Sequence, residues 1–434
     1  MKERTAYTFA VPAEELGRVE RRPWGSSLAG LRRWLESKRW DDALDLSNFA
    51  GTDWALLVAV LGLSCLGVLM IYSASLPGRF VPLNEPLNYY AVRQILWMAI
   101  GLAAMGLFWT VRYSFWREWS VELLIGSIGV LLLVLLVGDK RYNATRTLFN
   151  GSLQPSEFVK LAMILYAAIW LSSKKDKLQS FSFGLIPYGF MFGVVGGLIF
   201  AEPDKSTALL LLVVAVVMFI IAGAHPKEVV VILLVIALVA VVTFFSAGYA
   251  RDRTESFINR WSQPSWADPD DQAYWFIQSL RAGGIFGKGL AGGEVKANVI
   301  LPHSDGIFAV IGEEFGLVGA LVVLGVYMWI ARKGLEIARR APDMMGMLMA
   351  LGITVWLTLQ AFINIAVAVG AVPVTGMPLP FLSYGGSSLI SALAGVGVLL
   401  NISRYATGEE DPGNASGAVW WRNRRTRLSH PGRR

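Results

Sequence analysis

Cysteine and charged residues are the two classes that this sequence has least of. The single cysteine, Cys65, excludes any disulfide within the chain, and its place in an apolar run favours a packing role. Only 16% of the residues are charged, whereas 54% are hydrophobic and the mean hydropathy is +0.50. A soluble chain of 434 residues needs far more polar surface, so the composition indicates a membrane protein.

The N-terminal sequence also lacks the apolar core of a secretory signal. Residues 1–50 are polar throughout, so no cleavable signal peptide is expected. The formal net charge of +7 does not indicate nucleic-acid binding, because the cytoplasmic loops of membrane proteins are usually basic.

Long apolar segments recur along the chain and predict an all-α integral membrane protein with ten transmembrane helices. A span needs about 20 apolar residues to cross a hydrocarbon core of about 30 Å. The expected spans are 54–74, 91–110, 121–137, 155–172, 184–201, 206–223, 228–248, 312–331, 345–369 and 388–402.

Basic residues orient these spans. With ten alternating spans, one side of the membrane receives the basic N-terminal tail, KKDK at 174–177, RKGLEIARR at 332–340 and the arginine-rich C-terminal tail. That side is expected to be cytoplasmic, with both termini inside. The basic loop GDKRYNATR at 138–146 is the exception, because it faces outward in this topology.

Three regions outside the spans complete the predicted organisation. Residues 1–53 form a cytoplasmic tail that contains either an interfacial helix or a solvated polar segment. Residues 249–306 form a large extracytoplasmic loop between spans 7 and 8, and its aromatic residues favour an ordered loop. Residues 405–434 form a basic cytoplasmic tail that is predicted to be disordered.

Charged residues gather at the start of the expected helix at 155. Glu157 and Lys160 are three residues apart, so they share a helix face and can form an ion pair. Arg146 lies just before this helix and is suited to bidentate contact with a phosphate. Ionisable groups at membrane depth are candidate functional residues, although self-neutralisation of Glu157 and Lys160 remains an equal alternative.

Two further polar stretches interrupt the apolar sequence. In EPDKSTALLLL, Ser206 and Thr207 can cap a helix whose dipole favours Asp204, and this structural role is the more favoured one. In PLPFLSYGGSSL, prolines and two glycines predict a re-entrant segment before span 10, with serines capping the last helix. Ser383 lies in this segment, and Gly385 and Gly386 are expected to serve its backbone shape.

The stretch HSDGIFAVIGEEFG carries three carboxylates at the outer edge of span 8. Asp305 lies at the water–lipid boundary, where it is either a helix cap or a catalytic group. Glu313 and Glu314 come more than two turns deeper, so they are expected to cap or pair inside the helix bundle.

Four motifs together resemble the SEDS family (shape, elongation, division and sporulation), the FtsW/RodA group. They are LQPSEFVKLA, EPDKSTALLLL, HSDGIFAVIGEEFG and PLPFLSYGGSS, in the order typical of that family. The last two are more similar to the division branch, FtsW, than to the elongation branch, RodA. The sequence departs from the family pattern at Ser304, Gly306, Thr147 and at Lys205 and Ser206.

The resemblance implies a peptidoglycan glycosyltransferase that polymerises lipid II at the division septum of the bacterial cytoplasmic membrane. It also implies a class B penicillin-binding protein and other divisome proteins as partners. With this chemistry, Asp305 is the expected general base, while Arg146, Lys160 and the weaker candidate Arg93 bind pyrophosphate. No cofactor is certain; a divalent cation, Mg²⁺ or Mn²⁺, is a candidate without assigned ligands.

Three alternatives stay open from the sequence. A lipid II flippase would also have many spans and intramembrane charges, but it needs binding groups reachable from both sides. A division scaffold would use the same sites only for partner contacts. A RodA-like polymerase would act in elongation rather than division.

Overall fold

The computed structural model describes residues 49, 51–76, 86–141, 144–147, 153–174, 178, 180–202, 204–225, 227–231 and 272–406. The chain divides into two compact units, Met1–Asp42 and Ala43–Arg434, and the first lies wholly outside these described residues. The expected interfacial helix, the seventh span beyond 231, the outer loop before 272 and the tail after 406 also lie outside them.

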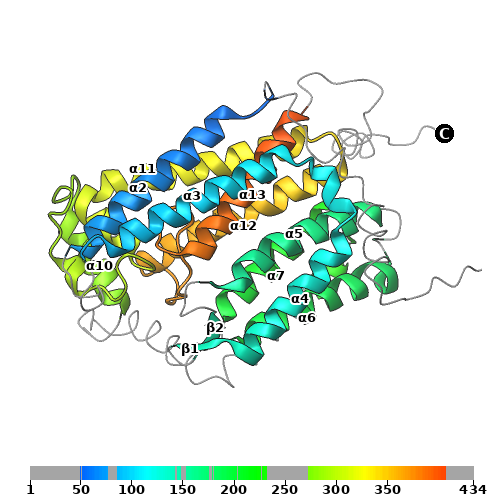
Figure 1. Ribbon diagram of the computed structural model, residues 1–434, viewed down its shortest axis with the longest axis horizontal. Coiled ribbons are helices and arrows are strands. Elements are labelled where there is room, and N and C mark those ends of the chain that lie inside the picture. Colours follow the sequence, from blue (N-terminus) through cyan, green and yellow to red (C-terminus); the bar gives the residue numbers. More distant parts are fainter. Residues whose placement is uncertain are drawn as a thin grey trace, which may run out of the picture. The chain divides into compact units, whose positions relative to one another are not determined.

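Helices dominate the described residues (Figure 1). Eight segments there are long and apolar enough to cross a membrane, so a mostly helical, multi-pass protein is confirmed. They are α2 (Trp54–Ser75), α3 (Tyr89–Thr110), α4 (Ser120–Val137), α5 (Pro155–Ser173), α6 (Ile186–Ala201, with a preceding π-helical turn at Phe181–Leu185), α11 (Ile307–Arg340), α12 (Met344–Ala368) and α13 (Gly386–Arg404). The others are the shorter apolar helix α7 (Lys205–Ile221), α10 (Gln272–Gly283) and two 3-10 turns, Tyr113–Arg117 and Val295–Asn298.

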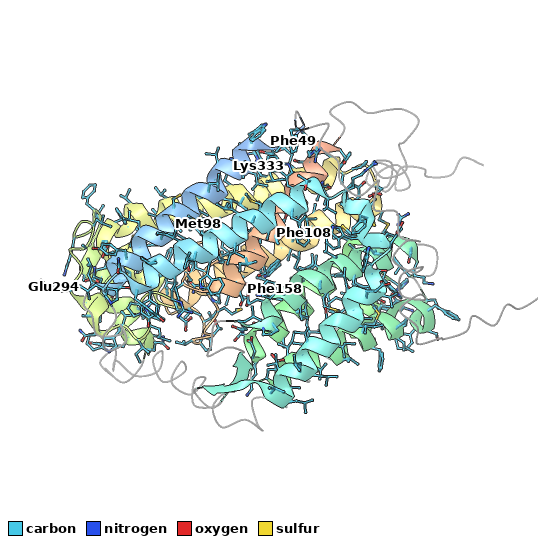
Figure 2. All side chains as sticks on the ribbon, in the orientation of Figure 1. Phe49, Met98, Phe108, Phe158, Glu294 and Lys333 are labelled. Carbon is cyan, nitrogen blue, oxygen red and sulfur yellow. The ribbon has the colours of Figure 1, made fainter. Side chains whose placement is uncertain are left out.

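One helix is much longer than expected. The span predicted at 312–331 is part of α11, which begins at Ile307 and continues through the basic stretch to Arg340. Glu336 supports this extension, because it pairs with Lys333 at 3.4 Å and with Arg340 at 2.7 Å along the helix. Figure 2 shows Glu294 near the start of α11 and Lys333 towards its other end.

A short hairpin departs from the all-α expectation. Strands β1 (Asp139–Arg141) and β2 (Ala144–Thr147) pair antiparallel, with Lys140 opposite Thr145. The helix before them ends at Val137 and the next begins at Pro155, so the backbone between them satisfies part of its hydrogen bonding by pairing with itself.

The helices of Ala43–Arg434 differ strongly in burial. Helix α13 packs along α3, and α12 contacts both α5 and α7, which themselves pack against α4 and α6. Within the protein, 89% of the apolar window of α13 is buried but only 17% of that of α4. The inner helices therefore pack on protein, whereas the apolar surface of α4 is suited to lipid.

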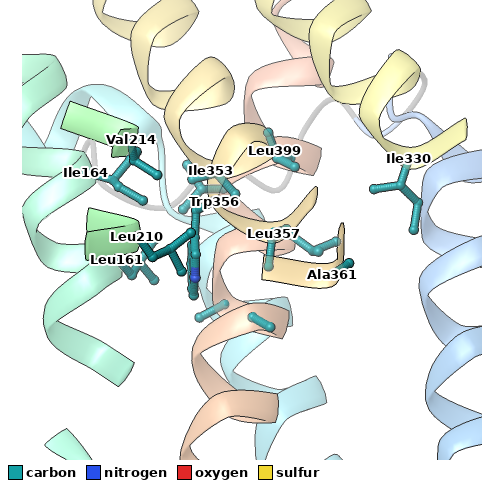
Figure 3. Close-up of a cluster of buried hydrophobic side chains, with 14 of the residues drawn as sticks. Leu161, Ile164, Leu210, Val214, Ile330, Ile353, Trp356, Leu357, Ala361 and Leu399 are labelled. Carbon is teal, nitrogen blue, oxygen red and sulfur yellow. The ribbon is translucent and has the colours of Figure 1, made fainter. Parts of the chain in front are cut away.

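A cluster around Trp356 joins these helices (Figure 3). Leu161 and Ile164 of α5 and Leu210 of α7 lie next to this tryptophan of α12, which is 1% exposed. On α13, Gly395 approaches so closely that a Cβ there would lie 3.3 Å from the Trp356 ring. Dense apolar packing of this kind fixes the relative positions of the helices that carry the polar residues.

Helix α11 is broken at Gly316, whose φ of +67° favours glycine. The break frees backbone groups on both sides, and the glycine-rich loop after α10 pairs with them in a strand-like manner. The four bonds are Lys288 N to Glu313 O (3.0 Å), Gly289 N to Glu314 O (2.9 Å), Leu317 N to Gly284 O (2.9 Å) and Val318 N to Ile285 O (3.2 Å). The described part of the outer loop is therefore ordered against this span.

Two expectations at the start of α13 were wrong. Gly385 has a φ of 169°, an extended conformation open to any residue, and no side chain caps the helix. Ser387 instead accepts a hydrogen bond from Gln154 N at 2.8 Å, which ties α13 to α5. Gly386 is required for proximity rather than backbone shape, because a Cβ there would lie 2.6 Å from the Trp97 ring.

These two glycines provide a matched test. We expect Gly386→Ala to lower stability by about 1–3 kcal/mol, the usual cost of overpacking. Gly385→Ala has room, since its Cβ would lie 3.7 Å from Ser388, and should stay near the parent. Thermal unfolding of both purified variants in detergent measures the difference. Equal stability of the two variants would contradict this account.

Candidate active site

Asp305 lies immediately before α11 but does not cap it. The N-cap residue is Gly306, and no side chain there accepts a helix N–H. The half-buried carboxyl accepts a hydrogen bond from Ser304 Oγ at 3.3 Å, and its Oδ2 lies 3.7 Å from the position of a Cβ on Gly376. The cap alternative for Asp305 is therefore wrong, and the carboxyl faces a non-helical segment of the chain.

That segment, residues 376–385, fixes the backbone around Asp305. Tyr384 N donates to His303 O at 2.8 Å, and Ser383 Oγ donates to Ser304 O at 2.7 Å. The same Ser383 Oγ accepts from Leu379 N at 2.8 Å. A single hydroxyl thus closes a turn of the segment and ties it to the residue before Asp305.

Side chains from several helices satisfy the other polar groups of segment 376–385. Its backbone includes left-handed residues, Gly376 (φ +72°) and Phe381 (φ +69°), so it cannot bond as a helix does. The donors are Gln94 Nε2 to Ser383 O (3.2 Å), Gln360 Nε2 to Pro378 O (2.9 Å), Asn364 Nδ2 to Met377 O (2.8 Å) and Tyr327 Oη to Pro380 O. Asn364 also donates to the carbonyl of Asp305 at 3.3 Å, so it links the segment to the candidate base.

An aromatic cluster lies beside Asp305. His303 is 4% exposed and stacks on Tyr90 with ring centres 4.1 Å apart, while Tyr384 contacts it edge-on at 5.5 Å. Burial lowers the pKa of His303 to about 4, so this imidazole is neutral at pH 7. Burial raises the pKa of Tyr384, and the nearby charge of Arg93 acts against that shift. Arg93 itself donates to Tyr89 Oη at 2.5 Å.

Lys160 is enclosed on all sides, at 1% exposure. Its Nζ donates to Glu157 Oε1 and to Gln360 Oε1, both at 2.9 Å. Because Gln360 also donates to Pro378 O, Lys160 connects α5 through α12 to segment 376–385. The expected ion pair with Glu157 is therefore present, and a pyrophosphate contact for Lys160 stays a prediction.

Asp204 acts as the cap of α7, in place of Ser206 or Thr207. Its Oδ1 accepts from Thr207 N at 3.2 Å, and its Oδ2 accepts from Gln154 Nε2 at 2.8 Å and Ser156 Oγ at 3.4 Å. Ser206 Oγ instead donates to Thr375 O at 3.0 Å, next to segment 376–385.

Glu202 was missed as a candidate by the sequence analysis. It ends α6, is fully buried, and among the described residues no donor reaches either carboxylate oxygen. Burial, followed by the charge of Asp204, raises the pKa of Glu202 to about 8. Its position in the EPD sequence at the end of an apolar run could have indicated it, because such a carboxylate has no obvious counter-charge.

The two glutamates of α11 are fully buried and bonded. Glu313 accepts from Val295 N and Lys296 N, both at 2.8 Å. Glu314 accepts from Lys296 Nζ and from Ser73 Oγ of α2. Glu313 therefore holds the outer loop to α11, and Glu314 holds both the loop and α2 to it, so neither presents a carboxylate to a sugar.

The polar contacts above bring most of the predicted residues to one end of the helices. Four parts of the chain adjoin one another there: Asp305, Gly376, Ser383 and the start of α13. Arg93 lies near Tyr384. Arg146 belongs to β2, and its side chain lies outside the described part of the structure. The half-buried carboxyl of Asp305, which accepts from Ser304 Oγ, is suited to accepting a proton from a hydroxyl group.

The family model described as "Cell cycle protein", which covers FtsW, RodA and SpoVE, matches residues 54–408. The chain belongs to this family. The resemblance to the FtsW/RodA group stated from the four motifs is thus confirmed. Similarity to proteins of this family extends along nearly the whole helical region and is not confined to those motifs.

Relatives in the FtsW/RodA/SpoVE family match over most of their length. The chain is 37% identical to the probable peptidoglycan glycosyltransferase FtsW of Geobacter sp. (strain M18), covering 82% of this chain and 98% of that one. It is 38% identical to stage V sporulation protein E of Bacillus subtilis (strain 168), with 82% and 97% covered.

Solved structures of the family show the same architecture. Rod shape determining protein RodA of Thermus thermophilus is 27% identical, with a TM-score of 0.61 and 82% of this chain and 98% of that one covered. A chain from a study of the coordination of polymerization and crosslinking by a peptidoglycan synthase complex is also 27% identical, with a TM-score of 0.68 and coverages of 82% and 99%.

The enclosed ion pair of α5 generates a stability test. Lys160→Met should cost about 3–5 kcal/mol, because it leaves Glu157 charged and buried without its partner. The double variant Glu157→Gln/Lys160→Met removes both charges and should recover more than half of that loss. Lys333→Met, at a partly exposed pair with Asp53 (3.2 Å), serves as the control and should cost about 1 kcal/mol or less. Unfolding of each variant in detergent checks this order, and equal losses in the single and double variants would refute it.

Proposed function

We propose that this chain is a peptidoglycan glycosyltransferase that polymerises lipid II in the bacterial cytoplasmic membrane during cell division. The observation that carries the proposal is the half-buried carboxyl of Asp305, held by segment 376–385 in a chain 37% identical to a probable peptidoglycan glycosyltransferase FtsW. A carboxylate at a helix start on the outer side can reach sugars in water while the lipid tail stays between helices.

The reaction joins two sugars by displacement. The 4-hydroxyl of one sugar attacks the anomeric carbon of another, a C–O bond forms with inversion, and the bond to the lipid pyrophosphate breaks. Asp305 takes the hydroxyl proton, a step worth roughly 10²–10⁴-fold in rate. Its rivals are poorly suited, because His303 is buried and Glu313 already accepts two backbone N–H groups.

Cations must stabilise the departing pyrophosphate. Arg146 and Lys160 are assigned this role, with Arg93 as a weaker member near the aromatic cluster. For Lys160 the alternative is purely structural, since Glu157 and Gln360 occupy its ammonium group. Activity of the Glu157→Gln/Lys160→Met double variant decides between the two roles.

A transporter that flips lipid II is the second candidate. It needs polar groups reachable from both sides of the membrane. Three contacts instead join helix ends on one side of the membrane. They link Asp305 to Gly376, Ser206 to Thr375 and Gln154 to Ser387. This one-sided arrangement favours the polymerase.

The division role and the partner are further parts of the proposal. FtsW proteins are among the relatives, which supports a place at the septum over the RodA-like elongation role. A class B penicillin-binding protein is the proposed partner, because a structural relative comes from a complex that coordinates polymerization with crosslinking. Other divisome proteins are expected around this pair, and nucleic acid is not.

Replacement of the proposed base gives the central test. Asp305→Asn keeps the size of the side chain but cannot accept the proton, so glycan polymerisation should fall at least ~100-fold. Expression, lipid II binding and partner association should match the parent. Purified protein with labelled lipid II in detergent is the assay, since polymerisation can occur there and flipping cannot. Parent-like polymerisation by the variant would remove Asp305 from catalysis.

The topology of the proposal has ten spans, both termini in the cytoplasm and the loop before α11 outside. Lys288 lies in that loop and Arg340 at the far end of α11, and both are exposed. In a Cys65→Ala background, Lys288→Cys should react with an impermeant maleimide in intact cells and Arg340→Cys should not. Labelling of the second variant alone would reverse the orientation.

A further inference from the structure

Glu202 is a carboxyl group whose surroundings lack a counter-charge. Within the described part of the chain, neither of its oxygens has a hydrogen-bond donor, although the residue is fully buried. It also occupies the C-cap position of α6, where the helix dipole is negative. A group in this position is stable only with a proton or with a positive ligand.

Asp204, two residues after Glu202, carries a second carboxyl, and this carboxyl is held rigidly. Three donors fix Asp204: Thr207 N, Gln154 Nε2 and Ser156 Oγ. A carboxylate offers about four lone-pair positions, so Asp204 keeps one and Glu202 keeps all four. The pair therefore presents unused oxygen acceptors from two residues that repel each other.

No basic side chain of the described residues fills this position. The ammonium group of Lys205 lies 5.7 Å from the centre of the Phe200 ring, and Lys160 is bound by Glu157 and Gln360. The group that neutralises Glu202 is therefore either a proton or a cation from outside the protein. Oxygen acceptors of this kind select hard divalent ions.

We propose that Glu202 and Asp204 bind a divalent cation, Mg²⁺ or Mn²⁺, whose remaining positions are taken by water and by the pyrophosphate of the lipid substrate. This inference rests on the proposed function for the identity of the phosphate ligand. The described residues hold no group of three or more His, Cys, Asp or Glu side chains suited to a metal. Two carboxylates leave an octahedral ion incomplete, which is the usual arrangement for Mg²⁺ that binds through substrate phosphates.

The location of the acid pair suits this role. Ser206 of α7 bonds to Thr375 O, and Gly376, the next residue, adjoins Oδ2 of Asp305. Gln154, which bonds to Asp204, also donates through its backbone N–H to Ser387 at the start of α13. The cation and the base thus border the same segment from different helices. The base receives the proton of the attacking hydroxyl, and the cation takes up charge on the leaving pyrophosphate.

The test measures Mn²⁺ binding directly. Electron paramagnetic resonance of the purified full chain, titrated with Mn²⁺ with and without undecaprenyl pyrophosphate, reports bound metal independently of turnover. We expect the lipid pyrophosphate to tighten binding in the parent. Glu202→Gln and Asp204→Asn should each weaken binding about 10-fold or more, as loss of support at metal sites typically does. Asparagine still caps helices, so the second variant keeps α7 intact.

Two controls separate the outcomes. Glu228→Gln changes another buried carboxyl, which accepts from His225 N at 3.3 Å, and should leave Mn²⁺ binding unchanged. Asp305→Asn should bind Mn²⁺ like the parent while losing polymerisation, so failure of the base assignment does not affect this readout. Glutamine mimics a protonated glutamate, and parent-like Mn²⁺ binding by Glu202→Gln would therefore assign Glu202 a proton and overturn the cation site. Absence of Mn²⁺ binding by the parent would overturn it as well.

Discussion

Buried backbone groups must find partners inside the protein, and segment 376–385 concentrates this demand at one place. Its left-handed residues prevent helical bonding, so the partners are side chains from other helices. Gln94, Gln360 and Asn364 are each no more than 2% exposed and donate to its carbonyls. The positions of α3 and α12 are thereby coupled to the segment that faces Asp305.

The same segment explains why such an apolar protein retains buried polar residues. Each of these buried amides donates a hydrogen bond to a carbonyl that would otherwise be unpaired. Lys160 of α5 joins the same network by donating to Gln360 Oε1. The cluster around Trp356 is mainly apolar, and the indole N–H of that residue donates to Gln360 Oε1 at 2.9 Å. Several buried polar residues therefore serve the segment where the backbone departs from a helix, which is also where a substrate with a charged headgroup would require them.

The sequence predicted the helices and several polar residues, but it did not predict the hydrogen bonds and ion pairs that connect them. Apart from α11, apolar runs predicted the described spans to within a few residues, because length and hydropathy largely determine them. The break at Gly316 and the extension of α11 to Arg340 depend on contacts with the outer loop and on local ion pairs, which no hydropathy pattern contains.

The candidate site divides in the same way. Charge in an apolar setting pointed to Asp305, Asp204 and Lys160, since ionisable residues are conspicuous there. Gln94, Gln360 and Asn364 are uncharged and inconspicuous in sequence, yet they hold segment 376–385. The backbone role predicted for Gly386 was wrong because its steric proximity to Trp97 is a property of the folded chain, and the one predicted for Gly385 was wrong because its backbone is extended.

The strand-like pairing at Gly316 has a mechanical consequence. Main-chain bonds join the loop to α11 on both sides of the break, so a pull on the loop from outside the membrane is transmitted as force to a transmembrane helix. Because side chains carry none of those four bonds, substitutions at most loop positions leave the transmission intact. A methyl group at Gly287 or Gly316 would interrupt it, since a Cβ at either position would lie less than 2.5 Å from backbone atoms of the other element.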